Sequence, residues 1–340
     1  MLTRKNFKNY AENFLNWCEY PAVKYKISLD FLDVPHENLT DLRKDFLKSD
    51  IVLELRDTQD YSGRWGKLHT VIDKNPEIKT KFTQTTMGAL SRCLYIGLRI
   101  EDESDILTLA LEHLEDILQD KSYSLIKKYG YEKNERAVPW HLSGVAGMVE
   151  AISPNNSLCD DLYNQWNYIA ICAFEDGEYS HERDKKAQHE LLGTREDRLV
   201  PLPLGLLLNR GVSSELEKSM LDYYGKGAYY RGHLWWVPLD KMRENPPVWV
   251  NKYSLRIFPT IDYINQFKNT REYLDDTIDW LENNKNHDNL WDFGPQVSFD
   301  PWGSWRYFST NKNHRYNRTV NCTMEVLSTF KKYLDNNKIL

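Results

Sequence analysis

Asp60-Tyr-Ser-Gly-Arg-Trp65 places an acid, a short polar turn and an aromatic residue directly after a charged helical pattern. Four more segments of this kind follow along the chain. Their aromatic residues are Tyr123, Tyr179, Trp235 and Trp291, at successive steps of 58, 56, 56 and 56 residues from Trp65. A nearly constant period of this size predicts one repeated supersecondary unit, and six such units fill almost all of the 340 residues.

Apolar residues recur at steps of three to five along most of the chain, and period-2 alternation bounded by turn residues is scarce. This pattern predicts an all-α protein in which the repeated unit is a pair of helices. The predicted helices span residues 5–19, 22–33, 38–58, 83–98, 104–119, 138–153, 158–174, 198–209, 214–225, 254–267, 270–284 and 317–335.

Two kinds of helix alternate in this prediction. One kind is rich in Gly, Ala and Leu and poor in charge, as at 83–98 and 138–153, which is typical of helices contacted on all sides. The other kind carries charges on one face, as at 38–58 and 104–119, and suits an outer layer. We therefore expect a single domain over residues 1–340, an (α/α)6 toroid that the N-terminal helix closes. Its inner ring is expected near 24–32, 83–98, 138–153, 198–209, 254–267 and 317–335.

The alternation of helices and the phrases RDTQDYSGRWG, TQTTMGALSRCLYIGL and NLWDFGP resemble the alpha/alpha toroid superfamily, which includes squalene and hopene cyclases and protein prenyltransferase beta subunits. The resemblance covers most of residues 20–335 and implies a central cavity lined by the inner helices. It implies a structural role for the turn aromatics, which are expected to pack at the rim between neighbouring hairpins. These are Trp65, Tyr123, Tyr179 and Trp291.

Motifs of specialised chemistry are absent from the sequence. The nearest match to the acidic DxDD motif of the cyclases is Leu274-Asp-Asp-Thr-Ile-Asp279, on a charged outer helix, and the zinc-binding Asp-x-Cys triplet of the prenyltransferases does not occur. The chain also lacks GxxxxGK[ST], a GxGxxG after a strand and GxSxG. We therefore expect no nucleotide hydrolysis or dinucleotide redox chemistry, no metal and no cofactor.

The candidate catalytic residues are His141 and Asp176. His141 follows Trp140 in the first turn of a predicted inner helix that also carries Glu150, and a neutral imidazole there can act as a base or a hydrogen-bond donor. Asp176 lies in the densest titratable cluster, residues 174–190, which we expect to form a loop and which can supply an acid/base pair or, alternatively, bind a divalent metal. Glu175 and Glu178 flank the same turn.

Aromatic residues define the expected substrate site. The stretch from Trp291 to Arg318 is rich in aromatic residues, and a loop of this length is typical of a lid or binding loop. An arginine in it, Arg306 or Arg315, would meet an anion. The predicted substrate-binding residues are Trp140, Trp235, Trp236, Trp302, Trp305 and Arg306, and the alternative for them is plain packing against the rim.

Charge and cysteine usage exclude several classes of function. The chain carries a net charge of −6 with no basic stripe, so we expect no nucleic-acid partner. Its apolar runs are too short for a membrane span, and because the N-terminus is charged and lacks an apolar block we expect no secretory signal. Five widely spaced cysteines are typical of reduced thiols in a cytoplasmic protein. One of them, Cys322, is expected to begin an inner helix, where a thiolate nucleophile is an alternative to a core thiol.

These observations predict an enzyme that acts on a small, largely apolar organic metabolite by general acid/base chemistry in an aromatic-lined cavity. One alternative is a carbohydrate-active hydrolase or lyase on the same fold, which needs two carboxylates roughly 5–10 Å apart. The other is a non-catalytic binding or scaffold protein. The substrate, the reaction type and the oligomeric state stay open at this level.

Overall fold

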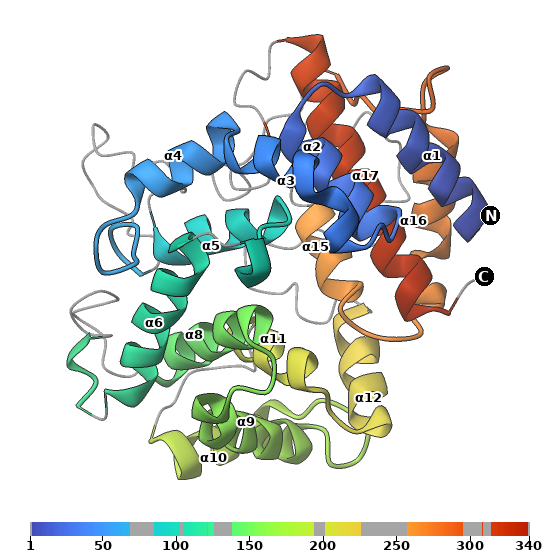
Figure 1. The fold of residues 1–340 in the computed structure, drawn as a ribbon. Coiled ribbons are helices and arrows are strands. Elements are labelled where there is room, and N and C mark those ends of the chain that lie inside the picture. Colours follow the sequence, from blue (N-terminus) through green and yellow to red (C-terminus); the bar gives the residue numbers. More distant parts are fainter. Residues whose placement is uncertain are drawn as a thin grey trace. The chain divides into compact units, whose positions relative to one another are not determined.

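The computed structural model describes residues 2–68, 85–102, 105–120, 122–125, 138–193, 201–225, 257–294, 308 and 314–338 (Figure 1). All regular secondary structure in these ranges is helical, which confirms the all-α prediction. The α-helices are α1 (Arg4–Trp17), α2 (Pro21–Lys26), α3 (Thr40–Leu47), α4 (Asp50–Thr58), α5 (Thr86–Tyr95), α6 (Asp105–Gln119), α8 (Val138–Ile152), α9 (Asp160–Ala173), α10 (His181–Leu192), α11 (Pro201–Arg210), α12 (Ser214–Gly225), α15 (Ile257–Ile264), α16 (Arg271–Asn283) and α17 (Arg315–Asn336).

Two predictions about the helices were wrong. The range 38–58 is two helices, because the chain breaks after α3 and Ser49 turns its hydroxyl back onto the Phe46 carbonyl. Residues 181–192 form α10 rather than a loop. The Ser180 side chain caps the first turn of α10 by accepting from the Arg183 N–H, and Gly193 ends the helix in the left-handed conformation.

The chain divides into two compact units. The terminal unit comprises Met1–Glu54, Tyr95–Gly97 and Leu221–Leu340, and the middle unit comprises Leu55–Leu94 and Leu98–Met220. The prediction of one domain over residues 1–340 stays a prediction.

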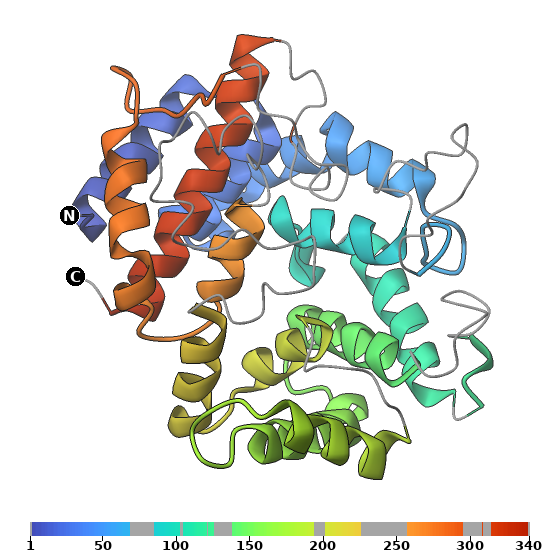
Figure 2. The same ribbon diagram turned by 180° about the vertical axis from the view of Figure 1, so that it is seen from behind.

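In the terminal unit the first helix packs on the last two. Figures 1 and 2 both show α1 beside α16 and α17. The Tyr10 ring meets the Trp291 ring edge-on at 5.7 Å, and Arg4 pairs with Asp335 at 2.9 Å. The centre of this unit is α17, where every residue from 317 to 327 is buried, as expected for an inner helix.

In the middle unit α8 packs against both α6 and α11, and α9 pairs with α10 (Figure 1). The contact of α8 with α11 is close at Gly147, where an added Cβ would lie 3.2 Å from the Leu206 backbone nitrogen. The low charge and small residues of these two helices therefore reflect helix-on-helix burial, as the sequence indicates.

Two of the repeated turns, one in each unit, have matching hydrogen bonds. The Trp65 indole donates to the Leu55 carbonyl at 2.8 Å, and the Trp291 indole donates to the Leu281 carbonyl at 2.7 Å, in each case ten residues back in the preceding helix. The backbone N–H groups of Trp65 and Trp291 donate to threonine hydroxyls of the following helix, at 3.1 and 3.0 Å. Those hydroxyls belong to Thr86 in α5 and Thr323 in α17.

The two turns also share their internal geometry. Asp60 and Asn286, five residues before each tryptophan, accept backbone N–H groups of the turn with their side-chain oxygens. Gly63 and Asn289, two residues before each tryptophan, have φ values of 83° and 56°. Each turn thus ties an outer-type helix to the next inner-type helix, which confirms that the indoles of Trp65 and Trp291 have a structural role.

The prediction that Tyr123 packs at the rim was wrong. Its side chain is 46% exposed, and its own φ is 56°, so it takes the left-handed place that Gly63 takes in the first turn. Leu125, two residues after Tyr123, therefore occupies the position that Trp65 occupies two residues after Gly63. Tyr179 follows the left-handed Gly177 by two residues and packs its ring against Phe174 at 5.5 Å, which fits the register of Trp65.

Replacing Gly63 with alanine is expected to lower the free energy of unfolding by about 2–4 kcal/mol, because left-handed backbone and overpacking both add a cost. An added Cβ would lie 2.0 Å from the backbone oxygen of Leu109 in α6. Gly211→Ala is the matched control, since its φ is 87° but no atom lies within 4 Å of the added Cβ. Urea denaturation of the two variants measures the difference, and equal losses would contradict the close approach.

Lowering the pH from about 4 to about 2 should lower the free energy of unfolding, because Asp60 in the first turn becomes protonated in this range. Burial acts to raise the pKa of Asp60, but hydrogen bonds from Arg64 and Ser62 outweigh it and lower the pKa from 3.8 to about 2. The stabilisation is complete above the unfolded pKa and is lost as pH falls through the folded one. The stability of Asp60→Asn, measured by urea denaturation across this window, should fall less steeply than that of the wild type, whereas Asp41→Asn at an exposed site should follow the wild type.

Candidate functional site

Trp140 and His141 lie in the first turn of α8, as predicted, and both are half-buried. The indole nitrogen of Trp140 is buried and has no hydrogen-bond partner among the described residues. The Trp140 carbonyl accepts from the Ser143 hydroxyl at 2.7 Å, which is a helical contact. The arrangement leaves the assignment of His141 as an acid or base a prediction.

Asp176 is exposed and held by an arginine. Its two carboxylate oxygens accept from Arg183 Nη1 and Nη2 at 2.9 and 2.5 Å, and Oδ1 also accepts the Glu178 N–H at 3.2 Å. The hydrogen bonds from Arg183 lower the pKa of Asp176 below its ordinary value. A carboxyl that stays ionised is a poor proton donor near neutral pH, so this geometry favours a turn-stabilising role.

The other predicted substrate-binding residues, Trp235, Trp236, Trp302, Trp305 and Arg306, lie outside the described residues. Phe308, from the same aromatic stretch, is described and buried. Its N–H donates to Asn321 Oδ1 in α17 at 3.0 Å, and its ring lies 5.6 Å from the ring of Tyr95. One point of the predicted binding loop is therefore anchored in the core of the terminal unit.

An ion pair between a buried lysine and a half-buried aspartate lies beside the same tyrosine. Lys26 ends α2, where the helix continues as the π-helix η1 (Ile27–Phe31), and its Nζ donates to Asp30 Oδ2 at 2.8 Å. The Lys26 side chain is 9% exposed. Its ammonium lies 5.9 Å from the ring centre of Phe31 and 5.8 Å from that of Tyr95. We call Lys26, Asp30, Phe31, Tyr95 and Phe308 the Lys26 cluster.

The π-helix explains how the cluster is built. The Leu32 N–H donates to the Ile27 carbonyl at 2.9 Å, a five-residue step that widens the turn by one residue. Such widened turns occur often at functional sites, because they turn a side chain away from the ordinary helical register. The sequence holds a signal for this cluster: a Lys and an Asp four residues apart in a predicted inner helix.

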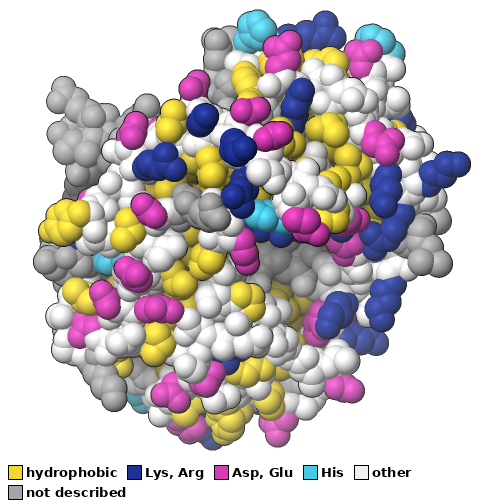
Figure 3. All heavy atoms as spheres, viewed as in Figure 1, with side chains coloured by type: hydrophobic (Ala, Val, Ile, Leu, Met, Phe, Trp, Pro, Cys, Tyr) yellow, Lys and Arg dark blue, Asp and Glu magenta, His cyan; other side chains and the backbone are white. Residues whose placement is uncertain are grey.

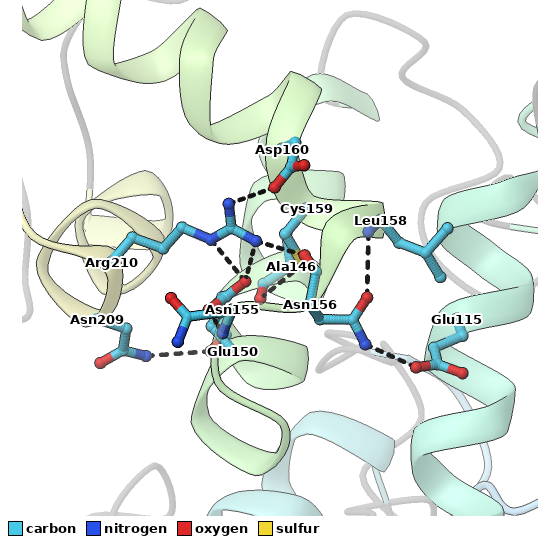
Figure 4. A network of polar contacts seen from close by, with 11 residues as sticks. Glu115, Ala146, Glu150, Asn155, Asn156, Leu158, Cys159, Asp160, Asn209 and Arg210 are labelled. Atoms are coloured by element: carbon cyan, nitrogen blue, oxygen red, sulfur yellow. Dashed lines mark hydrogen bonds and ion pairs between the residues drawn. The ribbon is translucent and has the colours of Figure 1, made fainter.

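A second ion pair, in which the carboxylate is buried, joins α8 and α11 of the middle unit (Figure 4). Glu150 of α8 is 3% exposed. Its Oε1 accepts from Arg210 of α11 at 2.7 Å, and its Oε2 accepts the Asn155 N–H at 2.9 Å. Arg210 also donates to Asp160 and to the Asn156 carbonyl. The hydrogen bond to Glu150 is the largest cause of the raised pKa of Arg210.

Further bonds extend this network to neighbouring elements. Asn156 Nδ2 donates to Glu115 of α6 at 2.7 Å, and Asn209 Nδ2 donates to the Gly147 carbonyl at 3.2 Å (Figure 4). The Arg210 guanidinium lies 5.7 Å from the ring centre of Tyr163 in α9. Both carboxylate oxygens of Glu150 accept hydrogen bonds. We therefore interpret the network as a structural link between α6, α8, α9 and α11, which we call the clasp, rather than as an acid/base group.

Cys322 lies within α17 rather than at the start of a helix, and it is buried. Burial raises the pKa of the Cys322 thiol to about 12. A thiol of this kind is protonated near neutral pH, so the structure favours the core role over the nucleophile. In the described ranges, no group of three or more His, Cys, Asp and Glu side chains is placed to hold a metal ion.

No helix in the described part of the chain combines the length and apolarity needed to cross a membrane. Comparisons with protein-family models, curated proteins and solved structures find no match to this chain.

Proposed function

We propose that this protein is an enzyme that acts on a small, largely apolar organic molecule by general acid/base chemistry, in the cytoplasm. We also propose that its helical hairpins form an (α/α)6 toroid. The matching turns at Trp65 and Trp291 support the repeat that such a toroid needs. The observation that carries the function is the Lys26 cluster.

The cluster combines two properties that this function requires. Burying an ammonium is costly even when a half-buried carboxylate pairs with it, so a largely apolar core offers little reason to place Lys26 there for stability alone. The rings of Phe31, Tyr95 and Phe308 provide an apolar surface next to the pair. In the proposed reaction the Lys26 ammonium donates a proton to the bound molecule and the Asp30 carboxylate accepts one.

The carbohydrate alternative receives no such support. It needs two carboxylates that face one another across a sugar. The carboxylates of Glu150, which is buried, and of Asp292, which is half-buried, are instead each held by an arginine, Arg210 and Arg318, at 2.7 and 2.5 Å.

The test is incubation of the purified chain with a defined panel of linear and cyclic terpenoid alcohols and hydrocarbons, followed by mass spectrometry of the products. Lys26→Met and Asp30→Asn are each expected to lower turnover about 100-fold or more, since acid/base groups typically contribute 10²- to 10⁴-fold. Lys44→Met is the matched control, because Lys44 also pairs with an aspartate, Asp41 at 3.3 Å, but at the surface.

Lys26→Arg keeps the positive charge and separates a chemical role from a folding role. Full activity of Lys26→Met in a folded protein would contradict the assignment of the cluster. Turnover of a panel of maltooligosaccharides instead of the terpenoids would support the carbohydrate alternative. Circular dichroism of each variant confirms that the helices are intact.

A further inference from the structure

The outward face of the α9–α10 hairpin exposes apolar side chains. The inward face of α9 packs into the core, since Trp166, Ile169 and Ala170 are buried. On the opposite side Tyr168 and Ile171, one helical turn apart, are 52% and 49% exposed. Leu191 near the end of α10 is 43% exposed. Single exposed apolar residues need no explanation, but three of the seven large ones among the described residues belong to this hairpin.

The same hairpin holds most of the net charge of the protein. Residues 160–192 contain eight Asp or Glu, of which Asp184 is buried, and three Lys or Arg, a net charge of −5 compared with −6 for the whole chain. Glu175, in the turn that follows α9, and Glu190 on α10 are both exposed. Figure 3 shows apolar side chains flanked by acidic ones along the lower edge, where Figure 1 places α9 and α10.

We infer that the exposed face of α9 and α10 docks a basic amphipathic helix from a partner protein. The apolar side chains of that helix would cover Tyr168, Ile171 and Leu191. Its lysines or arginines would pair with the exposed acidic side chains around them, such as Glu175 and Glu190, which we call the acidic rim. A helix is the fitting shape, because a helical hairpin packs against helices and offers no strand edge for pairing. The negative rim repels nucleic acid and anionic membrane surfaces, which excludes both as the occupant.

A synthetic peptide of leucine and lysine, about four helical turns long with the leucines on one face, is the probe. Fluorescence anisotropy should show saturable binding that weakens as salt rises. Ile171→Ser and Leu191→Ser should each raise the Kd about tenfold. Ile100→Ser, at a residue that is 37% exposed elsewhere in the middle unit, is the matched control and should leave the Kd unchanged.

Cys172 supplies an independent readout on this face. It is the one half-buried cysteine, and the other four are buried. Bound peptide should slow the reaction of Cys172 with a maleimide at least fivefold, and Cys172→Ser should abolish that labelling. A peptide of the same composition with its leucines scattered around the helix should neither bind nor protect.

Three results would overturn the inference. The first is equal binding of the patterned and scattered peptides, and the second is an unchanged Kd for both Ile171→Ser and Leu191→Ser. The third is a wild-type dimer in sedimentation velocity that Ile171→Ser converts to a monomer, since the occupant would then be a second copy of this chain. Terpenoid turnover is a separate measurement, so failure here does not bear on the proposed enzyme activity.

Discussion

Trp291→Ala and Trp65→Ala should each lower the free energy of unfolding by about 3–5 kcal/mol, the usual cost of removing a fully buried tryptophan. Trp65 is 1% exposed and Trp291 is 0% exposed. Each substitution removes the ring that fills the junction of two successive helices, and it also leaves a helix carbonyl, of Leu55 or Leu281, without its indole donor. Urea denaturation followed by circular dichroism measures both losses.

Tyr61→Ala is the control for the first turn, because the Tyr61 side chain is 94% exposed in the same segment. It should change stability by less than about 0.5 kcal/mol. Trp65→Phe should fall between the two, since it keeps most of the ring and loses the indole N–H. If Trp65→Ala lowered the free energy of unfolding as little as Tyr61→Ala, the hydrogen bonds and packing that the two turns share would not matter for stability.

Arg210→Met should also cost about 3–5 kcal/mol, because it leaves the Glu150 carboxylate buried without its positive partner. The Arg210 and Glu150 side chains are 12% and 2% exposed. The same substitution removes the hydrogen bonds that Arg210 donates to Asp160 and to the Asn156 carbonyl, so α8, α9 and α11 all lose contacts that join them. Thermal and urea denaturation of the variant measure the loss.

The double variant Glu150→Met/Arg210→Met removes both charges and should recover most of that loss, since a buried ion pair is often no better than apolar residues of similar volume. Lys186→Met breaks an exposed pair with Glu190, 3.9 Å apart, and should cost less than about 1 kcal/mol. A double variant that is less stable than Arg210→Met would show that the clasp acts through more than the buried charge.

The sequence by itself determined the helical class, most helix ranges and the repeated turn. These features depend on neighbours along the chain: apolar residues three to five apart form one helix face, and a left-handed residue two places before a tryptophan sets its turn. The sequence misplaced Tyr123 because a motif of acid, turn and aromatic does not reveal which residue adopts positive φ. It missed α10 because a dense run of charges is as typical of a loop as of an exposed helix.

Only the tertiary structure decided which charged residues are partners. Arg210 lies 60 residues from Glu150, and Tyr95 lies far along the chain from Lys26, so helical period and spacing carry no information about these contacts. The choice of Arg210 as the partner of Glu150 depends on which helices pack together and how deeply, whereas Lys26 and Asp30 are four residues apart and only their burial is a tertiary property. Burial sets the cost of each unpaired charge, and burial is a property of the folded chain rather than of any segment of it.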